Sequence, residues 1–297
     1  MLEKKSKILV PIGLSDQSFI ALEQAVNLAV KIQGSITVLS VLDSSASIYK
    51  LLNKDDQFGS AIETQLKVKL ESLIKPYEKK LDSNIEILIS KGKVYKEIIN
   101  TASLINVDMI VMGADGADSN IRKKIMGSNA SRVVSGSDIP VITIKGKKHR
   151  KGCGKILLPL DFSKETKEKV NFAINFAKVF DSEIIVFSAV FSKDEFISNK
   201  LMRNLDQVKG FIENQGIKCS GEINKFSKNT TLSKSVLDFS NIVNPDLIII
   251  MTQSESHFLS HFIGSTAQSI INNSEAPVLS ITPTKRKDTT VYDLPIG

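Results

Sequence analysis

The stretch Lys7-Ile-Leu-Val-Pro-Ile, near the start of the chain, returns further along as Lys155-Ile-Leu-Leu-Pro-Leu. The same offset matches polar as well as apolar residues over roughly 35 positions, which indicates an internal repeat. The further matched pairs are Ser15 and Ser163, Ala25 and Ala173, Asn27 and Asn175, Ala29 and Ala177, and Val38 and Val186. The chain therefore contains a duplicated domain.

Later blocks of the chain repeat as well, with an offset that is shorter by about ten residues. The matched blocks are Asp108-Met-Ile-Val-Met with Asp246-Leu-Ile-Ile-Ile, Gly127-Ser with Gly264-Ser, and Ile139-Pro-Val-Ile-Thr-Ile with Ala276-Pro-Val-Leu-Ser-Ile. The second copy is therefore shorter in its middle. We expect one domain over residues 1–146, a second over residues 152–283, and a polar tail over residues 284–297 that adds no strand.

Each copy alternates apolar runs with helical patterns, which is typical of an α/β fold. In the first copy the expected strands lie near residues 7–12, 35–42, 84–90, 108–113 and 140–145. The expected helices lie near residues 16–33, 59–81, 93–105 and 128–137. The strands at 36–42, 108–112 and 141–144 are nearly continuous apolar runs, which indicates strands covered on both faces. The sequence predicts a parallel sheet with helices on both sides in each copy.

Several polar and proline residues at the ends of these elements have a structural interpretation. Pro140 and Pro277 open the last strand of each copy, where a missing N–H is tolerated. A hydroxyl at a helix start can accept a hydrogen bond from an otherwise unpaired backbone N–H. Capping is therefore the first interpretation of four serines at expected helix starts: Ser15, Ser128, Ser163 and Ser265.

The composition indicates a folded globular protein, since 42% of the residues are hydrophobic and 24% are charged. No run of about 18 apolar residues predicts a transmembrane helix, and the N-terminus carries no signal-peptide pattern. Cys153 and Cys219 lack CxxC spacing, so neither a disulfide framework nor a metal site is expected. His257 and His261 have no nearby cysteine or well-spaced carboxylate and are interpreted as part of a polar loop. We expect a cytoplasmic protein.

The net charge of +7 raises the question of nucleic-acid binding. Much of the excess lies in residues 145–155, a short basic run flanked by glycines between two apolar strands. No aromatic residues are interleaved with it, so a solvated linker is the interpretation and nucleic acid is not an expected partner. A second basic run, Arg122-Lys-Lys, could steer an anionic ligand but is also explained as a solvated surface.

A candidate ligand site lies at the carboxyl ends of the strands, where doubly wound sheets bind their ligands. Two loops of the first copy qualify: residues 12–16 after the first strand, and the segment from Gly113 to Ser128 after the fourth. Glycines at 113 and 116 let backbone N–H groups approach a phosphate, and Gly127-Ser begins a helix whose positive end favours an anion. Tight turns also produce such glycines, so this pattern alone leaves both explanations open.

In combination these features resemble the universal stress protein family. The resemblance rests on a first strand with Val-Pro, a fourth strand ending Ile-Val-Met-Gly, the Gly-x-x-Gly…Gly-Ser loop and the closing Pro-Val-Ile-Thr-Ile, and it spans nearly all of both copies. It implies two tandem doubly wound domains, each a five-stranded parallel sheet of order 3-2-1-4-5 with helices on both faces. It also implies that the two domains pair through their last strands within this chain, and it leaves room for a homodimer.

Part of that family binds ATP through Gly-x2-Gly-x9-Gly-Ser/Thr, an Asp after the first strand and a Val in the second strand near the adenine. The first copy keeps the loop glycines and the hydroxyl, and Val38 stands at the valine position. Ten residues instead of nine separate its second and third loop glycines, and Gly13 replaces the Asp. The residues that the resemblance assigns to the ligand are Gly13, Val38, Gly113, Gly116, Gly127 and Ser128.

The second copy departs from the pattern in the opposite way. It has the acid, Asp161, and it keeps the loop length, but Met251 and Ser254 replace two glycines and leave Gly264-Ser. The Met251 side chain would obstruct a phosphate, whereas an extra loop residue in the first copy can bulge outwards. ATP is therefore expected in the first domain only.

These observations favour a tandem universal stress protein that binds an adenine nucleotide in its N-terminal domain and acts as a stress-response regulatory module. The alternative is a scaffold that binds no nucleotide and acts through a protein partner. A third hypothesis is an enzyme that hydrolyses ATP or transfers a group from it. No base or nucleophile stands beside the glycine loop, so no catalytic residue is assigned and at most weak ATP hydrolysis is expected.

Overall fold

The computed structural model describes residues 5–43, 56–114, 126–145, 149–162, 166–191, 194–226, 230–252 and 263–283. The first half comprises β1 (Lys7–Pro11), α1 (Asp16–Ile32), β2 (Ser35–Asp43), α3 (Asp56–Leu81), β3 (Glu86–Gly92), α4 (Val94–Leu104), β4 (Met109–Gly113), α5 (Ser128–Gly136) and β5 (Val141–Ile144). The second half comprises β6 (Lys155–Pro159), α6 (Thr166–Phe180), β7 (Glu183–Val190), α7 (Glu195–Glu213), β8 (Cys219–Lys225), α8 (Leu232–Val243), β9 (Leu247–Met251), α9 (Ser265–Asn273) and β10 (Val278–Ile281).

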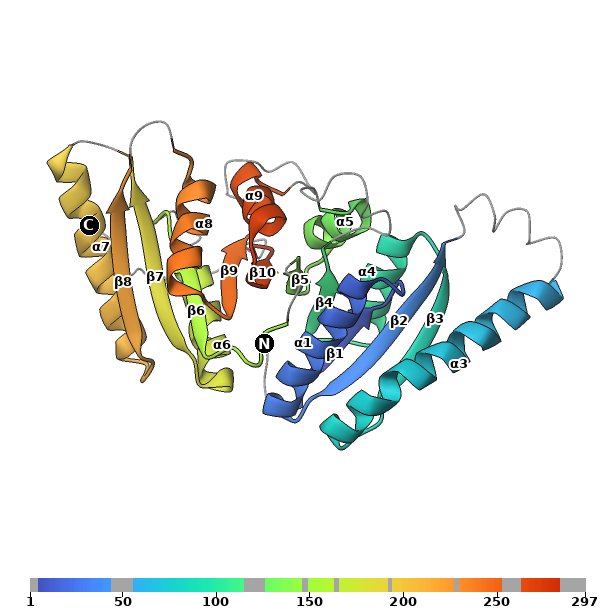
Figure 1. Ribbon diagram of the computed structural model, residues 1–297. Helices are drawn as coiled ribbons and strands as arrows, with labels where there is room; N and C mark the ends of the chain where they lie inside the picture. Colours follow the sequence, from blue (N-terminus) through green and yellow to red (C-terminus); the bar gives the residue numbers. More distant parts are fainter. Residues whose placement is uncertain are drawn as a thin grey trace, which may run out of the picture.

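The strands of both halves join in one ten-stranded sheet of order β3-β2-β1-β4-β5-β10-β9-β6-β7-β8 (Figure 1). Within each half, neighbouring strands run parallel in the expected order. The halves meet where β5 and β10 pair antiparallel, with Thr143 beside Val278. The Thr143 hydroxyl also donates to the Val278 carbonyl oxygen at 3.3 Å. Two tandem doubly wound sheets paired through their last strands are therefore confirmed, and together they make one mixed sheet.

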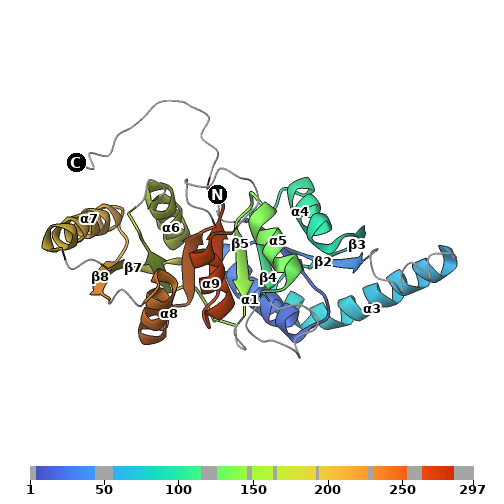
Figure 2. The same cartoon turned by 90° about the horizontal axis from the view of Figure 1, so that it is seen from above.

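Helices cover both faces of this sheet. One core contains the inward side chains of α1, α3, α6 and α7, and the other contains those of α4, α5, α8 and α9. Figure 2 shows α8, α9, α5 and α4 following one another across the face turned towards the viewer. Neighbouring strand residues alternate between the two cores, as Ile8 and Leu9 do, because successive side chains of a strand point to opposite faces. Both cores run through both halves, so the halves share their packing.

The described part of the basic linker is anchored rather than only solvated. The Arg150 N–H donates to Gln24 Oε1 at 2.7 Å, and the Arg150 carbonyl oxygen accepts from Asn27 Nδ2 at 3.0 Å. Its guanidinium reaches Asn244 Oδ1, at the end of α8, at 3.0 Å. Arg150 therefore ties α1 of the first half to α8 of the second. The expectation of a purely solvated linker was wrong for this residue, because the partners come from distant parts of the chain.

The domain limits at residues 146, 152 and 283 stay a prediction, and the tail over residues 284–297 lies outside the described residues. Over the described ranges, no helix combines the length and the apolar character that crossing a membrane requires. Cys153 and Cys219 are both buried and free, so they form no disulfide. Burial raises the pKa of both thiols, that of Cys219 to about 12, which disfavours the reactive thiolate.

Candidate functional site

The carboxyl ends of β1 and β4 form the point where the strand order of the first half reverses. β1 pairs with β2 on one side and with β4 on the other, and all three run parallel. The chain leaves β1 towards β2 and enters β4 only after β3, so the loops after β1 and β4 diverge. A crevice between two diverging loops is where open α/β sheets bind ligands. The two loops selected from the sequence therefore lie at neighbouring strand ends.

The loop after β1 is fixed by hydrogen bonds at Ile12 and is exposed at the next residue, Gly13. The Ile12 N–H donates to the Leu39 carbonyl oxygen at 2.8 Å, and the Ser40 hydroxyl donates to the Ile12 carbonyl oxygen at 3.1 Å. Gly13 is exposed, and a Cβ added to it would have no atom of a described residue within 4 Å. A side chain would fit at this position, so the absence of the family's Asp is not enforced by crowding.

The same loop then turns into α1. Leu14 has a left-handed φ of 58°, and its counterpart Phe162 has 55°, so both copies bend their backbone in the same way here. Ser15 caps α1, because its side chain accepts from the Ser18 N–H at 3.3 Å. The capping interpretation of Ser15 is confirmed.

Gly113 ends β4 under the first turn of α1. A Cβ added there would lie 2.9 Å from Gln17 Cβ and 3.1 Å from the Gln17 backbone carbon. The Gln17 amide nitrogen donates to the Lys145 carbonyl oxygen at 3.1 Å, which holds this turn over the ends of β4 and β5. Packing of α1 therefore already requires a glycine at 113, whether or not a phosphate binds beside it.

The loop after β4 is closed at its base by two backbone hydrogen bonds. The Ala114 N–H donates to the Ile144 carbonyl oxygen at 2.8 Å, and the Gly127 N–H donates to the Ala114 carbonyl oxygen at 2.8 Å. In the second half, Thr252 receives a hydrogen bond from Gly264 at 2.7 Å and donates to the Ile281 carbonyl oxygen at 2.9 Å. Ala114 and Thr252 are thus equivalent, and the loop between them and the next helix is one residue longer in the first half.

The helices that follow these loops are capped by glycine. Gly127 has φ −57° and ψ 146°, and Gly264 has φ −58° and ψ 146°, without a side-chain hydrogen bond at either cap. Ser128 and Ser265 are the first residues of α5 and α9 and are both exposed. The capping interpretation of these two serines was wrong, because the cap position belongs to the preceding glycine. Gly127 therefore supplies no side-chain acceptor to the first N–H groups of α5, which have no partner within the helix.

The second half supports the end of the first-half loop. Asn272, on α9, accepts a hydrogen bond through Oδ1 from the Met126 N–H at 2.8 Å. Met126 directly precedes the Gly127 cap and is buried. This contact places part of α9 beside the start of α5, in agreement with the neighbouring positions of both helices in Figures 1 and 2. The start of α5 is therefore positioned from both halves.

Val38 lies away from the exposed end of its strand. It pairs in register with Val10, and its side chain is 0% exposed in the core beside α1. The described residues of β2 nearest the ligand edge are 41–43, which are partly exposed. The structure therefore does not bring Val38 to the crevice with Gly13 and Gly113.

The corresponding edge of the second half carries larger side chains. Met251 ends β9 where Gly113 ends β4, and Asp161 is exposed after β6. Lys169, on α6, is 9% exposed, and its ammonium donates to the Pro159 carbonyl oxygen at 2.9 Å. The register of the repeat matches Lys169 with Ala21, which is 0% exposed. A lysine side chain therefore occupies space at the end of β6 that has no counterpart at the end of β1.

A model of the universal stress protein family matches residues 5–145. The first half of the chain therefore belongs to the universal stress protein family. A universal stress protein of Bacillus subtilis (strain 168) is 29% identical over 147 residues, which are 47% of this chain and 99% of the relative. A universal stress protein of Methanocaldococcus jannaschii is 26% identical over 155 residues, 48% of this chain and 95% of the relative.

A solved structure extends the likeness to both halves. The crystal structure of a universal stress protein from Archaeoglobus fulgidus DSM 4304 covers 93% of this chain and 98% of its own, with a TM-score of 0.74 and 22% identity. At this identity the likeness shows the fold. The chain thus has the fold of a tandem universal stress protein, with two halves of the same fold in one sheet.

Some residues selected from the sequence lie outside the described part of the chain. These are Gly116, Ser163, Ser254, His257, His261 and the run at residues 122–124. Of the assigned ligand residues, the structure brings Gly13, Gly113, Gly127 and Ser128 to the loops at the ends of β1 and β4. Whether they bind a ligand stays a prediction.

Two residues at these edges were missed by sequence reasoning. Lys169 has a visible signal, since the repeat places a lysine opposite the alanine at position 21 and a charged residue on a buried face is unusual. No sequence signal marks Asn272, because its contact with Met126 joins residues far apart in the chain.

Proposed function

We propose that this tandem universal stress protein binds an adenine nucleotide at the ends of β1 and β4 and acts as a stress-response regulatory module. The observation that carries the proposal is the glycine-capped start of α5. Gly127 has no side chain to cap the first N–H groups of α5, and the hydrogen bond between Gly127 and Ala114 holds them at the base of the loop. Uncapped N–H groups at the positive end of a helix form an anion site, which suits a phosphate.

The nucleoside side of the site follows from the loop after β1. Gly13 leaves open space at the position where part of the family carries an Asp. A ligand that enters here has one polar contact fewer but meets no obstructing side chain at residue 13. The proposed role of Gly113 is to let α1 pack closely, while the start of α5 holds the phosphates. The nucleotide would then bridge the two loops.

We assign no nucleotide to the second half. Met251 replaces the small residue at the end of β9, and the Lys169 side chain fills space at the end of β6. Both side chains would have to move before a ligand could enter as in the first half. In this proposal the second half completes the sheet and supports the first-half loop through Asn272.

Two serines in matching positions provide the test. Ser128 and Ser265 begin helices with nearly identical glycine caps, so Ser128→Ala and Ser265→Ala remove the same hydroxyl from the two halves. Calorimetric titration of Mg-ATP into the full chain should show affinity weakened about fivefold by Ser128→Ala, as expected for one hydrogen bond, and unchanged by Ser265→Ala. Mass spectrometry of the purified protein should detect a bound adenine nucleotide.

Two results would count against this site. If Ser128→Ala and Ser265→Ala bound ATP with equal affinity, the phosphate would not lie at the start of α5. Binding that survives Gly116→Val would also contradict it, because a branched side chain would crowd the backbone approach that the motif requires. We further propose that hydrolysis is weak at most, which a phosphate-release assay measures, and that the protein works in the cytoplasm.

A scaffold that acts through a protein partner is the second candidate. The observation in its favour is the shared packing, since both cores and the Arg150 anchor join the two halves into one unit. A protein that carries no nucleotide after purification and shows no heat of ATP binding would favour this function.

A further inference from the structure

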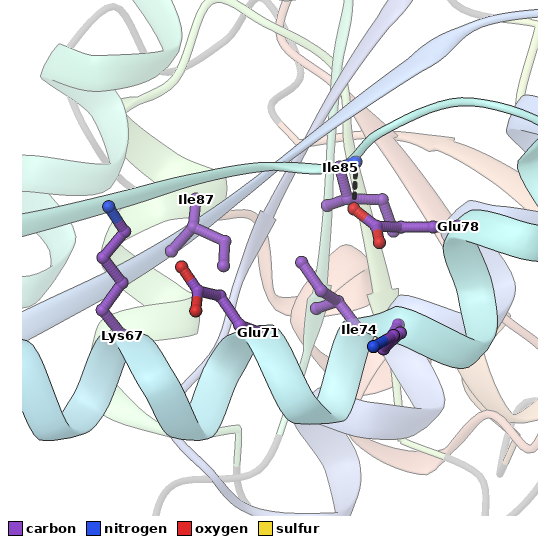
Figure 3. A pocket seen from close by; sticks show the side chains of 7 residues that line it. Lys67, Glu71, Ile74, Glu78, Ile85 and Ile87 are labelled. Atoms are coloured by element: carbon purple, nitrogen blue, oxygen red, sulfur yellow. Dashed lines mark hydrogen bonds between the residues drawn. The ribbon is translucent and has the colours of Figure 1, made fainter.

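The outer edge of the first half, formed by α3 and β3, is less closely packed than its counterpart. A hollow of about 350 Å³ lies between the helix and the edge strand (Figure 3). Its lining consists of charged residues of α3 and isoleucines of both elements: Lys67, Glu71, Ile74, Lys75, Glu78, Ile85 and Ile87. At the other end of the sheet, Leu205 of α7 lies over β8, 3.1 Å from where a Cβ of Gly221 would stand.

The charges along this side of α3 alternate in sign. Lys67, Glu71, Lys75 and Glu78 follow one another at spacings of four, four and three residues, which places them on one side of the helix. In Figure 3 the Lys67 and Glu71 side chains rise from the helix towards β3, with Ile87 above them. Within the described part of the chain, Lys67, Glu71 and Lys75 take part in no ion pair.

The stripe formed by Lys67, Glu71, Lys75 and Glu78 is complementary in charge to a second copy of itself that is rotated by a two-fold axis. Read in reverse, the order plus-minus-plus-minus becomes minus-plus-minus-plus. An antiparallel second copy would therefore place Lys67 opposite Glu78, and Glu71 opposite Lys75. Each pair would occur twice, because a two-fold interface uses the same surface on both copies.

The strand beside the stripe is open on the same side. Among the described strands, β3 is a terminal strand of the sheet and pairs with β2 alone. Such an edge presents backbone groups to a further strand. At the floor of the hollow Ile74 and Ile85 are buried, and Ile87 is partly exposed and adds apolar surface.

A single two-fold axis can relate both α3 and β3 to their counterparts in the second copy. The Ile85 N–H donates to Glu78 Oε1 at 3.0 Å, and Lys91 pairs with Glu63 at 3.1 Å, so α3 runs antiparallel alongside β3. With a rise of about 1.5 Å per helical residue and about 3.3 Å per strand residue, the middle of the charge stripe lies level with Ile87.

The same axis also sets the register of the two strands. An antiparallel pair centred on Ile87 would place Glu86 opposite Leu88, and no like charges would meet.

We propose that the outer edge formed by α3 and β3 is a homodimer interface, in which a second copy of this chain pairs β3 with β3 antiparallel across an axis near Ile87. Its geometry repeats at the outer edge what β5 and β10 do at the centre of the sheet. The interface lies apart from the ligand edge, so the dimer forms with or without nucleotide.

Charge exchange on the full chain tests this interface. In the dimer Glu71 of each copy faces Lys75 of the other, so Lys75→Glu and Glu71→Lys each bring like charges together at both of these positions. Each variant should raise the dimer dissociation constant roughly tenfold. The double variant Glu71→Lys/Lys75→Glu exchanges the partners and should restore the dimer. Sedimentation analysis across the micromolar range measures all four proteins, and circular dichroism checks that they are folded.

Matched controls use the other end of the sheet. Lys209→Glu breaks a similar exposed i,i+4 pair with Glu213 on α7 and should leave dimerisation unchanged. Ile87→Cys should give a disulfide-linked dimer under mild oxidation, because the two copies of residue 87 would face each other. Glu222→Cys on the β8 edge should not.

Three results would overturn the interface. One is a wild-type chain that stays monomeric throughout the concentration range. Another is a double variant as weak as either single one. The third is a wild-type dimer whose Ile87→Cys variant fails to cross-link.

Discussion

The described ends of the loops after β4 and β9 have the same backbone geometry and differ in their side chains. Both leave a residue that hydrogen-bonds to the last strand, and both return to a glycine cap with nearly the same φ and ψ. The first has Gly113 at its start, whereas the second has Met251. Lys169 lies at the neighbouring strand end of the second half, where the repeat gives the first half Ala21. The backbone frame of the edge is thus a property of the fold, and side chains decide what it can hold.

The largest expected effect comes from giving the first half the side chain of the second. Gly113→Met places a Cβ 2.9 Å from Gln17 Cβ, and the first turn of α1 would have to move. Overpacking of this kind costs about 1–3 kcal/mol, so the free energy of unfolding should fall by about that amount. The reverse change, Met251→Gly, should cost less because that side chain is partly exposed. Urea unfolding of both variants measures the difference, and equal losses would show that α1 does not require the glycine.

Lys169→Ala sharpens the comparison at the end of β6. The change removes one hydrogen bond to the Pro159 carbonyl oxygen and leaves that oxygen without this donor, at a cost of about 1–2 kcal/mol of unfolding free energy. It reproduces the alanine of the first half but leaves Met251 in place, so no second nucleotide site should appear. Thermal unfolding and a calorimetric stoichiometry measure the two effects. A stoichiometry of two nucleotides per chain would show that Lys169 alone closes the second site.

Gly13→Asp tests whether the open position can carry the family acid. Among the described residues no atom lies within 4 Å of an added Cβ, so the stability of the fold should be unchanged. A new hydrogen bond to the ligand should tighten ATP binding by about fivefold. The matched variant Asp161→Gly should leave ATP binding unchanged. If Gly13→Asp weakened binding, the nucleoside would not lie beside the loop after β1.

Asn272→Ala carries the smallest expected effect and tests whether the second half supports the first. The amide accepts from the Met126 N–H at 2.8 Å, next to the start of α5. Its loss should weaken ATP binding only about threefold, because the contact acts on the loop and not on the ligand. The neighbouring Asn273, which donates to the Ser269 carbonyl oxygen within its own helix, provides the control variant Asn273→Ala. Equal affinities for the two variants would leave the cross-half contact without influence on the ligand.

The fold could be predicted because the signal was long and repeated. The apolar run at 108–113 became β4 (Met109–Gly113), and the shared register of the first strands predicted two matching sheets. Errors at element ends were small, as for β3 (Glu86–Gly92), which was expected at 84–90. Periodicity marks the buried middle of an element more sharply than its ends, where local hydrogen bonds decide.

The candidate site was predicted less completely because it depends on tertiary contacts between residues that lie far apart in the sequence. The need for glycine at 113 comes from Gln17, which lies far away in the sequence. Ser128 was taken for a cap because a shift of one residue separates a cap from a first helical residue, and only backbone angles resolve it. Lys169 is charged and would ordinarily be placed at the surface.

The antiparallel seam between β5 and β10 has a consequence for assembly. Two separate chains would have to meet in solution to pair these strands, and dilution would separate them. Here the segment around Arg150 keeps the two halves at a high effective concentration, so the paired state is independent of how much protein the cell makes. One half can then give up ligand binding altogether without leaving the assembly, since its tether and its last strand are enough to keep it there.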